Sequence, residues 1–456
     1  MKKFLLLFLV TSLSVGASAQ RRHNSRNRNS DEPAVYIISV KETDTIYRNN
    51  PNYDPMFAQQ RLVEQKNVAV RSAIQDHRET TRAGFQQVSA PSVIFANSRN
   101  TFSFAIGGYV NLRLAYGFNS TINNIDVVPY DIPMIRNYAD KQKLEMDATT
   151  SRIYFRGIAN SRCLGRVVIF FDADFRGGRQ GSYTPRLRSG YVSFLGLTIG
   201  RDITTFCDLT AAPRTIDFQG PNAYNFNFAT VLRYEVSFAR DHMTFGVAAE
   251  MPHVSGTYGT TFNPIPQRVP DFPVYLQVAW GKHRQSHIRA SAVFRDMYLH
   301  NDTTDSNTAL FGWGVQASGN IHIGRVFQLF FNGVYGEGIT PYIQDLTGSG
   351  LDFTPNPLKT SSIQTMPMYG WQAAAQINLW RNVSISGGYS AVTVCKKNGY
   401  YATDEYRMGQ YIFGNIFCNI TKRFQIAAEY LWASRKNMDG LKHHGQRVNF
   451  MMQYNF

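Results

Sequence analysis

The chain contains little charge and no long hydrophobic run. Charged residues make up only 17% of its 456 residues, whereas a nucleic-acid-binding protein with a net charge of +15 would usually be richer in them. Beyond residue 19 no apolar stretch approaches the roughly 20 residues of a membrane-spanning helix. The mean hydropathy of −0.28 also argues against a helical membrane protein. Disorder and collagen are excluded, because hydrophobic residues reach 43% and glycine has no repeat.

Cysteine is also scarce. The four cysteines, Cys163, Cys207, Cys395 and Cys418, lie far apart and have no metal-binding spacing. Four cysteines allow three pairings, and free thiols are equally compatible with the sequence. The chain has no phosphate-binding loop, dinucleotide motif or metal-ligand cluster, so we expect no cofactor and no metal.

The first 19 residues have the three parts of a secretory signal peptide. Lys2 and Lys3 precede the apolar run Phe4–Val10, and Ala17-Ser18-Ala19 supplies a small-residue cleavage site. The apolar run is too short to span a bilayer. We therefore predict that residues 1–19 are removed after export.

From about residue 101 the hydrophobic pattern has a period of two. In one such segment the apolar residues Leu232, Tyr234 and Val236 alternate with Arg233 and Glu235. Segments of about ten residues with one apolar and one polar face are typical of transmembrane β-strands. Without spanning helices, an exported membrane protein must form a closed barrel, because lipid leaves no partner for free backbone groups. We predict an all-β fold in which residues 99–456 form a transmembrane antiparallel β-barrel.

The barrel is predicted to have about 16 strands. They start near residues 101, 143, 165, 185, 197, 226, 242, 272, 287, 309, 326, 367, 382, 406, 423 and 445. Short connections such as 239–241 alternate with long ones such as 252–271. Short periplasmic turns and long outer loops produce this alternation in outer-membrane barrels. An even number of strands places both chain ends in the periplasm.

The last strand ends on an aromatic residue, Phe456, with Tyr454 two positions before it. A terminal aromatic of this kind resembles the signal that the barrel assembly machinery of the Gram-negative outer membrane reads. The alternative is that Phe456 is only an interfacial anchor.

Residues 20–98 are predicted to form a periplasmic N-terminal region, which begins with a polar tail and a short strand at 35–40. In the segment 55–81, Val63, Val70 and Ile74 have helical spacing. Two interpretations remain open. The segment is either an amphipathic helix lying on another surface or a short trimeric coiled coil with Asn67 as its polar register residue. Because the membrane band begins at residue 101, we expect removal of residues 20–95 to leave a folded barrel.

Six motifs in the barrel region resemble the DcaP-like porins, a family of outer-membrane channels for small organic anions. They occur at residues 106–112, 150–152, 186–193, 213–221, 335–339 and 429–432. The resemblance covers about residues 101–456. It implies a sixteen-stranded trimeric barrel, a third loop folded into the lumen and an N-terminal helical segment in the periplasm.

The charged residues on the polar faces of the strands are predicted to line the lumen. The arginines are Arg113, Arg152, Arg156, Arg166, Arg186, Arg188, Arg233, Arg289, Arg295, Arg435 and Arg447. The acids are Asp172, Asp174, Glu235, Glu250 and Glu429. Arginine rings favour anions, since each guanidinium stays charged and matches a carboxylate.

Two alternatives to an anion-attracting surface remain. The arginines can be structural partners of the acids across the wall, or Asp172 and Asp174 can face them across a constriction. Arg186 and Arg188 lie ~7 Å apart along one strand, and Arg152 and Arg156 lie two strands away, ~10 Å from them. These four arginines are the predicted basic wall patch.

The third outer loop, about 208–225, is predicted to fold into the lumen. Pro213 and Pro221 stiffen it, and its Arg214 and Asp217 are candidates for a constriction. A loop that covers the mouth or contacts a neighbouring subunit is the alternative.

The predicted function is passive diffusion of small hydrophilic solutes through an outer-membrane porin, with a preference for organic anions such as carboxylates. The expected partners are outer-membrane lipid and lipopolysaccharide, the assembly machinery, small anionic solutes and two further copies of the chain in a homotrimer, with no nucleic acid. The alternative is a barrel enzyme or an adhesin that acts through long loops. Catalysis has little support, because only His443 and His444 with Asp439 form a candidate cluster.

Overall fold

The computed structural model describes residues 34–38, 55–97, 101–119, 125–135, 138, 141–179, 181–399 and 402–456. The predicted signal peptide and most of the polar tail lie outside these residues. Residue contacts divide the chain into two units, Met1–Ala34 and Val35–Phe456. The description below concerns the second unit.

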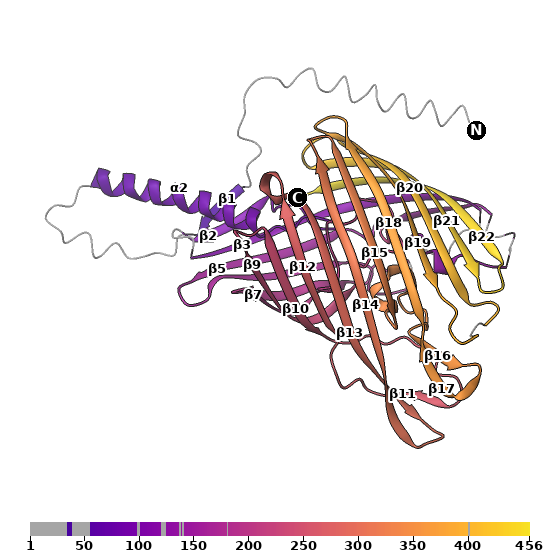
Figure 1. Ribbon diagram of the computed structural model, residues 1–456. Helices are drawn as coiled ribbons and strands as arrows, with labels where there is room; N and C mark the ends of the chain where they lie inside the picture. The colour runs from indigo at the N-terminus through magenta and orange to yellow at the C-terminus, as the bar shows by residue number, and fades with distance from the viewer. Residues whose placement is uncertain are drawn as a thin grey trace, which may run out of the picture. The chain divides into compact units, whose positions relative to one another are not determined.

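Sixteen antiparallel strands form a closed barrel (Figure 1). They are β3 (Phe102–Asn119), β5 (Arg152–Ser161), β6 (Gly165–Asp174), β7 (Arg186–Phe194), β8 (Leu197–Ile203), β9 (Phe228–Phe238), β10 (Met243–Glu250), β12 (Phe272–Trp280), β13 (Ser286–Asn301), β14 (Ser306–Ile323), β15 (Phe327–Glu337), β18 (Pro367–Asn378), β19 (Val383–Val394), β20 (Tyr406–Asn419), β21 (Phe424–Asn437) and β22 (Lys442–Asn455). Each strand pairs with its neighbours in this order, and β22 pairs with β3 to close the ring.

Alternating hydrophobicity predicted these strands well. Each of the sixteen predicted starts lies within about three residues of an observed strand start. The prediction near residue 143 corresponds to β4 (Lys143–Asp147), which pairs with the later part of β3, while β5 pairs with its earlier part. The predicted sixteen-stranded fold is thus confirmed.

Several short elements are added to the barrel. Strand β2 (Val93–Asn97) pairs with β3, β1 (Ala34–Ile38) pairs with β2, and β11 (Phe262–Pro264) pairs with β13. β16 (Phe353–Asn356) and β17 (Lys359–Thr365) form a separate hairpin. The short helices are η2 (Pro129–Asp131), η4 (Lys282–Arg284), η5 (Thr340–Tyr342) and η6 (Gln344–Leu346).

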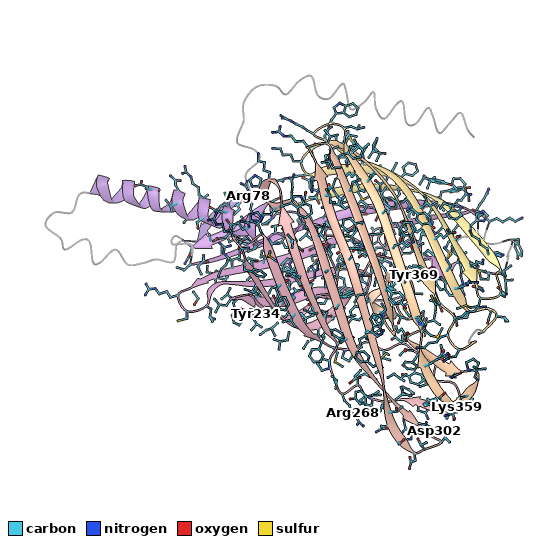
Figure 2. The ribbon with its side chains drawn as sticks, viewed as in Figure 1. Arg78, Tyr234, Arg268, Asp302, Lys359 and Tyr369 are labelled. Carbon is cyan, nitrogen blue, oxygen red and sulfur yellow. The ribbon has the colours of Figure 1, made fainter. Side chains whose placement is uncertain are left out.

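The connections define two ends of the barrel. The end with the short connections, such as 195–196 and 239–242, is called the turn end here. The end with the long connections, such as 204–227 and 338–366, is called the loop end. Figure 2 shows Arg268, Asp302 and Lys359 together at the loop end.

The wall is apolar outside and polar inside. In β9 the outward side chains of Leu232 and Tyr234 are 52% and 47% exposed, while Arg233 between them is only 6% exposed. Figure 2 shows Tyr234 and Tyr369 on the outer surface of the wall. Charged side chains buried inside and apolar side chains exposed outside are the arrangement of a barrel whose solvent is lipid.

The long helix of the described residues, α2 (Pro55–Glu79), agrees with the helix predicted for 55–81. Among the described residues no helix is both long enough and apolar enough to cross a bilayer. The last turns of α2 pack Ala73 and Ile74 against Ile94 of β2 and Ala105 of β3. This packing favours the amphipathic interpretation for these turns, while Asn67 is exposed and the coiled coil stays a prediction.

His77 fixes the end of α2 to the barrel. Its Nε2 lies 3.2 Å from Ser103 Oγ, and its side chain is fully buried. Burial, together with the nearby charge of Arg156, lowers the pKa of His77 to about 4. The imidazole is therefore neutral at physiological pH.

Candidate functional site

The third long loop, residues 204–227 between β8 and β9, lies against the inner wall of the barrel. It bonds inward-facing side chains on seven strands, from β13 to β21. These wall residues are His287, Gln316, Ser318, Asn332, Gln372, Ser390, Tyr411, Asn415, Gln425 and Glu429. The loop therefore crosses the lumen, as the sequence analysis expected, and does not cover the mouth.

Asp208 anchors the first part of this loop. One of its carboxylate oxygens lies 2.8 Å from His287 Nε2 and accepts a 2.8 Å hydrogen bond from Ser318 Oγ. Burial alone raises the pKa of Asp208, but the hydrogen bond and charge of His287 outweigh it and lower the value to about 2. Asp208 is thus a carboxylate at neutral pH. Sequence analysis did not identify this anchor, because Asp208 lies in a loop, where no periodicity predicts the direction of a side chain.

Asp217 anchors the middle of the loop. It accepts hydrogen bonds from Tyr411 (2.8 Å) and from the amide of Val127 (3.1 Å). The amide of Asp217 itself donates to Glu429 at 2.8 Å. Burial, with the neighbouring charges of Asp126 and Glu429, raises the pKa of Asp217 to about 8. Asp217 is therefore largely protonated at neutral pH.

Arg214, the other predicted loop residue, reaches from the loop to side chains of β20 and β21 on the inner wall. Its guanidinium donates to Gln425 Oε1 at 2.8 Å and lies 5.1 Å from the ring centre of Phe417. No carboxylate among the described residues lies within 4.0 Å of it, and its side chain is exposed. It lines a cavity of about 80 Å³ with Arg113, Phe218 and other residues. Arg214 is thus an exposed cation on the third loop.

The predicted basic wall patch is largely paired with acids. Arg152 forms an ion pair with Asp172. Arg186 and Arg188 share Asp174, with N–O distances of 2.6 and 3.0 Å. This geometry matches the alternative in which the arginines are structural partners of the two acids.

The fourth member of the patch, Arg156, differs from the other three. It has no carboxylate within 4.0 Å in the described part of the chain. It donates instead to the carbonyl of His77 (3.0 Å) and to Thr81 Oγ1 (2.7 Å).

Other predicted lumen arginines are also paired with acids, and among these acids only Glu235 was identified from strand parity. These pairs are Arg113 with Asp126 and Asp147 (both 2.6 Å), Arg233 with Asp202 (2.5 Å) and Glu235 (3.4 Å), and Arg295 with Asp271 (3.0 Å) and Asp352 (3.2 Å). Glu235 also accepts a 2.5 Å hydrogen bond from Tyr275. Asp126, Asp271 and Asp352 belong to loops, where no periodicity predicts a side chain's direction. The excess of arginine counted on the strands is therefore reduced in the folded lumen.

The remaining arginines vary in their surroundings. Arg166 pairs with Asp76 and Glu79 of α2 at the turn end. Arg447 pairs with Glu145 at 3.6 Å. Arg289 lies 3.4 Å from the ring centre of Tyr275 and lines a second cavity, of about 170 Å³, with Arg82 and Arg233. Arg435 donates to Asn437 and to the carbonyl of Tyr130.

The described residues give little support to catalysis. No group of three or more His, Cys, Asp or Glu side chains among them can hold a metal ion. His443 contacts the carbonyl of Pro133 at 2.9 Å, not Asp439. Ser318 and His287 both contact Asp208, so the histidine is not placed to activate the serine hydroxyl.

A closed sixteen-stranded barrel with a lipid-facing apolar band, a charged interior and a loop across the lumen defines a porin-type outer-membrane channel. The sequence model of the family described as "Porin subfamily" matches residues 104–454, and the chain belongs to this family. The expected family resemblance is thereby confirmed.

Two solved structures have a fold similar to that of this chain. The chain is similar to the outer membrane channel DcaP of Acinetobacter baumannii, with 18% identity and a TM-score of 0.67 over 78% of this chain and 97% of that one. It is also similar to the outer membrane protein OmpT of Vibrio cholerae lacking loop L8, with 10% identity, a TM-score of 0.51, and coverage of 78% and 100%. No curated protein matches the chain significantly.

Proposed function

We propose that this outer-membrane porin is a passive diffusion channel for small hydrophilic solutes with a preference for organic anions, chiefly carboxylates. In this proposal the turn end faces the periplasm, together with α2. The protein works as a homotrimer within lipid and lipopolysaccharide. Phe456, whose backbone pairs with Gly108, is the signal for the assembly machinery.

The observation that carries the anion preference is the position of Arg214. Most arginines of the lumen are neutralised by carboxylates, so they contribute little net field. Arg214 is an exposed residue of the loop that crosses the lumen, and its guanidinium contacts the amide oxygen of Gln425 and the ring of Phe417. A carboxylate passing this loop can replace that neutral acceptor and gain a charge-assisted hydrogen bond. Arg156 and Arg289 add further charge without a carboxylate within 4.0 Å among the described residues.

The test is ion conduction by the purified protein in a planar bilayer. A porin gives discrete steps of current, and an anion preference gives a reversal potential of the corresponding sign across a KCl gradient. A cation-selective reversal potential would contradict the anion preference but leave the channel intact. Failure to conduct under any condition, with the barrel folded, would favour the enzyme or adhesin alternative.

A further inference from the structure

The segment between α2 and β2, residues 80–92, enters the lumen from the turn end. Arg82 Nη1 lies 2.6 Å from Asp202 Oδ2 on β8, and its guanidinium lies 4.8 Å from the ring centre of Tyr191 on β7. Further along, the carbonyl of Ser89 accepts a 2.8 Å hydrogen bond from Tyr154 on β5. The segment is thus bonded to inward-facing side chains of three strands.

Inside the barrel the segment meets the third loop through Phe85. The amide of Phe85 donates to the carbonyl of Leu209 at 2.7 Å. Its ring is 1% exposed and packs edge-on against Tyr224 and Phe226, with centroids 5.2 and 5.3 Å away. Edge-on packing adds a favourable electrostatic interaction between the rings to the burial itself. The contact is therefore a specific docking of the segment on the loop.

Two glycines allow this close approach. A Cβ on Gly84 would lie 2.2 Å from the carbonyl oxygen of Leu209, and Gly84 has a φ of +120°. On the loop side, a Cβ on Gly220 would lie 2.5 Å from the Phe85 ring. A side chain at either position would push the segment and the loop apart.

Gln86 joins the loop to the basic wall patch. Its side-chain amide donates to the carbonyl of Phe218 on the loop. Its side-chain oxygen accepts a 2.7 Å hydrogen bond from Arg188, and its backbone carbonyl accepts one from Arg152. The arginines predicted to attract solutes therefore hold the N-terminal segment in place.

We propose that the segment 80–92 forms the second half of the constriction, so that the permeation path is set by the contact between this segment and the third loop. The inference rests on the proposed channel function. Phe85 and Gln86 occupy space in the lumen and cover Arg152 and Arg188, which limits both the size of the solute and its access to these arginines. Displacement of the segment widens the path and uncovers this charge.

The test compares full-length variants as single channels. Gly84→Ala places a methyl group against Leu209 and wedges the segment away from the loop. The double variant Phe85→Ala/Gln86→Ala removes the docking contacts without a wedge. Ala83→Ser is the matched control, because the exposed Ala83 lies beside Gly84. The heat-dependent gel mobility of each variant reports whether its barrel is folded.

We expect Gly84→Ala and the double variant to raise single-channel conductance by roughly twofold or more, because conductance follows the open cross-section of a pore. Ala83→Ser should match the unmodified protein. If Gly84→Ala does not fold, the conductance of the double variant alone tests the inference. Unchanged or lower conductance in the folded variants overturns the inference while leaving the channel function in place. No conduction by the unmodified protein and every folded variant overturns the channel function instead.

Discussion

At the residue scale, selectivity depends on which charges remain without an opposite charge. Arg186, Arg188 and Asp174 form a cluster in which two guanidinium groups share one carboxylate. Arg214 contacts only an amide oxygen and a ring. An ion in the lumen therefore experiences Arg214 more strongly than the more numerous paired arginines.

Arg214→Gln is expected to lower the anion/cation permeability ratio by about two- to fivefold. The reason is that one unit charge near an ion in water is worth roughly 0.5–1 kcal/mol. The reversal potential across a KCl gradient measures the ratio, and the change should be largest at low salt, where screening is weak. Gln425→Ala is the matched control, since it removes the hydrogen bond to Arg214 but keeps its charge.

Asp217 makes the anchoring of the loop dependent on pH. Its pKa of about 8 lies above its ordinary value of 3.8, so the folded loop binds a proton that the detached loop loses. The stability of the attached loop is therefore full below pH 3.8, falls as pH rises, and reaches its minimum above pH 8. From pH 7 to pH 9 the loss is about 1 kcal/mol.

We expect the current noise of the open channel to increase between pH 7 and pH 9, and Asp217→Asn to abolish the increase. This window separates Asp217 from Asp345, whose pKa burial raises only to about 6. Noise that still increases with pH in Asp217→Asn would assign the effect to another group.

At the element scale, the third loop is the part of the lumen whose removal has the clearest expected effect. Deleting residues 213–221 removes Arg214 and Asp217 with their bonds to β20 and β21 and should raise single-channel conductance. Shortening the β16–β17 turn at the exposed Leu358 is the control, because this hairpin lies at the loop end. Equal conductance in both deletions, with the barrel folded, would mean that the loop does not restrict the path.

The N-terminal region divides, by its contacts, into an outer and an inner part. No described residue within 20–66 bonds a side chain of the lumen. Deleting residues 20–66 should therefore leave the fold of the barrel and its conductance unchanged. Deleting residues 20–95 also removes the segment 80–92 and part of β2. A folded barrel of higher conductance is expected, as read from gel mobility and single-channel recording. Loss of the barrel would show that β2 is part of its folding unit.

Periodicity revealed the strands and failed at the loops for one physical reason. Side chains of a β-strand between lipid and water alternate in direction every two residues, so the sequence predicts that Arg233 and Glu235 point to the same face. Asp126 and Asp352 lie in loops, and only the folded chain brings them to Arg113 and Arg295. The lumen arginines and the acids on the strands, such as Asp172 and Asp174, could therefore be named from the sequence, but the acids in the loops could not. Nothing in the sequence between α2 and β2 signals entry into the barrel either.

At the scale of the whole molecule, the stability of the barrel depends on apolar side chains where its outer surface faces lipid. Leu232→Arg places a charge on the lipid-facing side of β9 and should destabilise the barrel by about 2–4 kcal/mol if it lies near the bilayer midplane. Urea unfolding in lipid vesicles measures the change. Leu232→Phe keeps the site apolar and should change the free energy of unfolding far less, and a similar loss in both variants would point to packing alone.

The pairing of β22 with β3 has a consequence for biogenesis. Tyr109 lies opposite Asn455, so the contact that closes the ring joins the beginning and the end of the barrel sequence. Contacts so distant in sequence form slowly, because the entropy of closing a long loop must be lost first. No ribosome-bound chain can complete the ring before its last residues are made. Until then both terminal strands have unpaired edges that can pair with a neighbouring chain. We therefore expect the protein to need a chaperone between translocation and insertion.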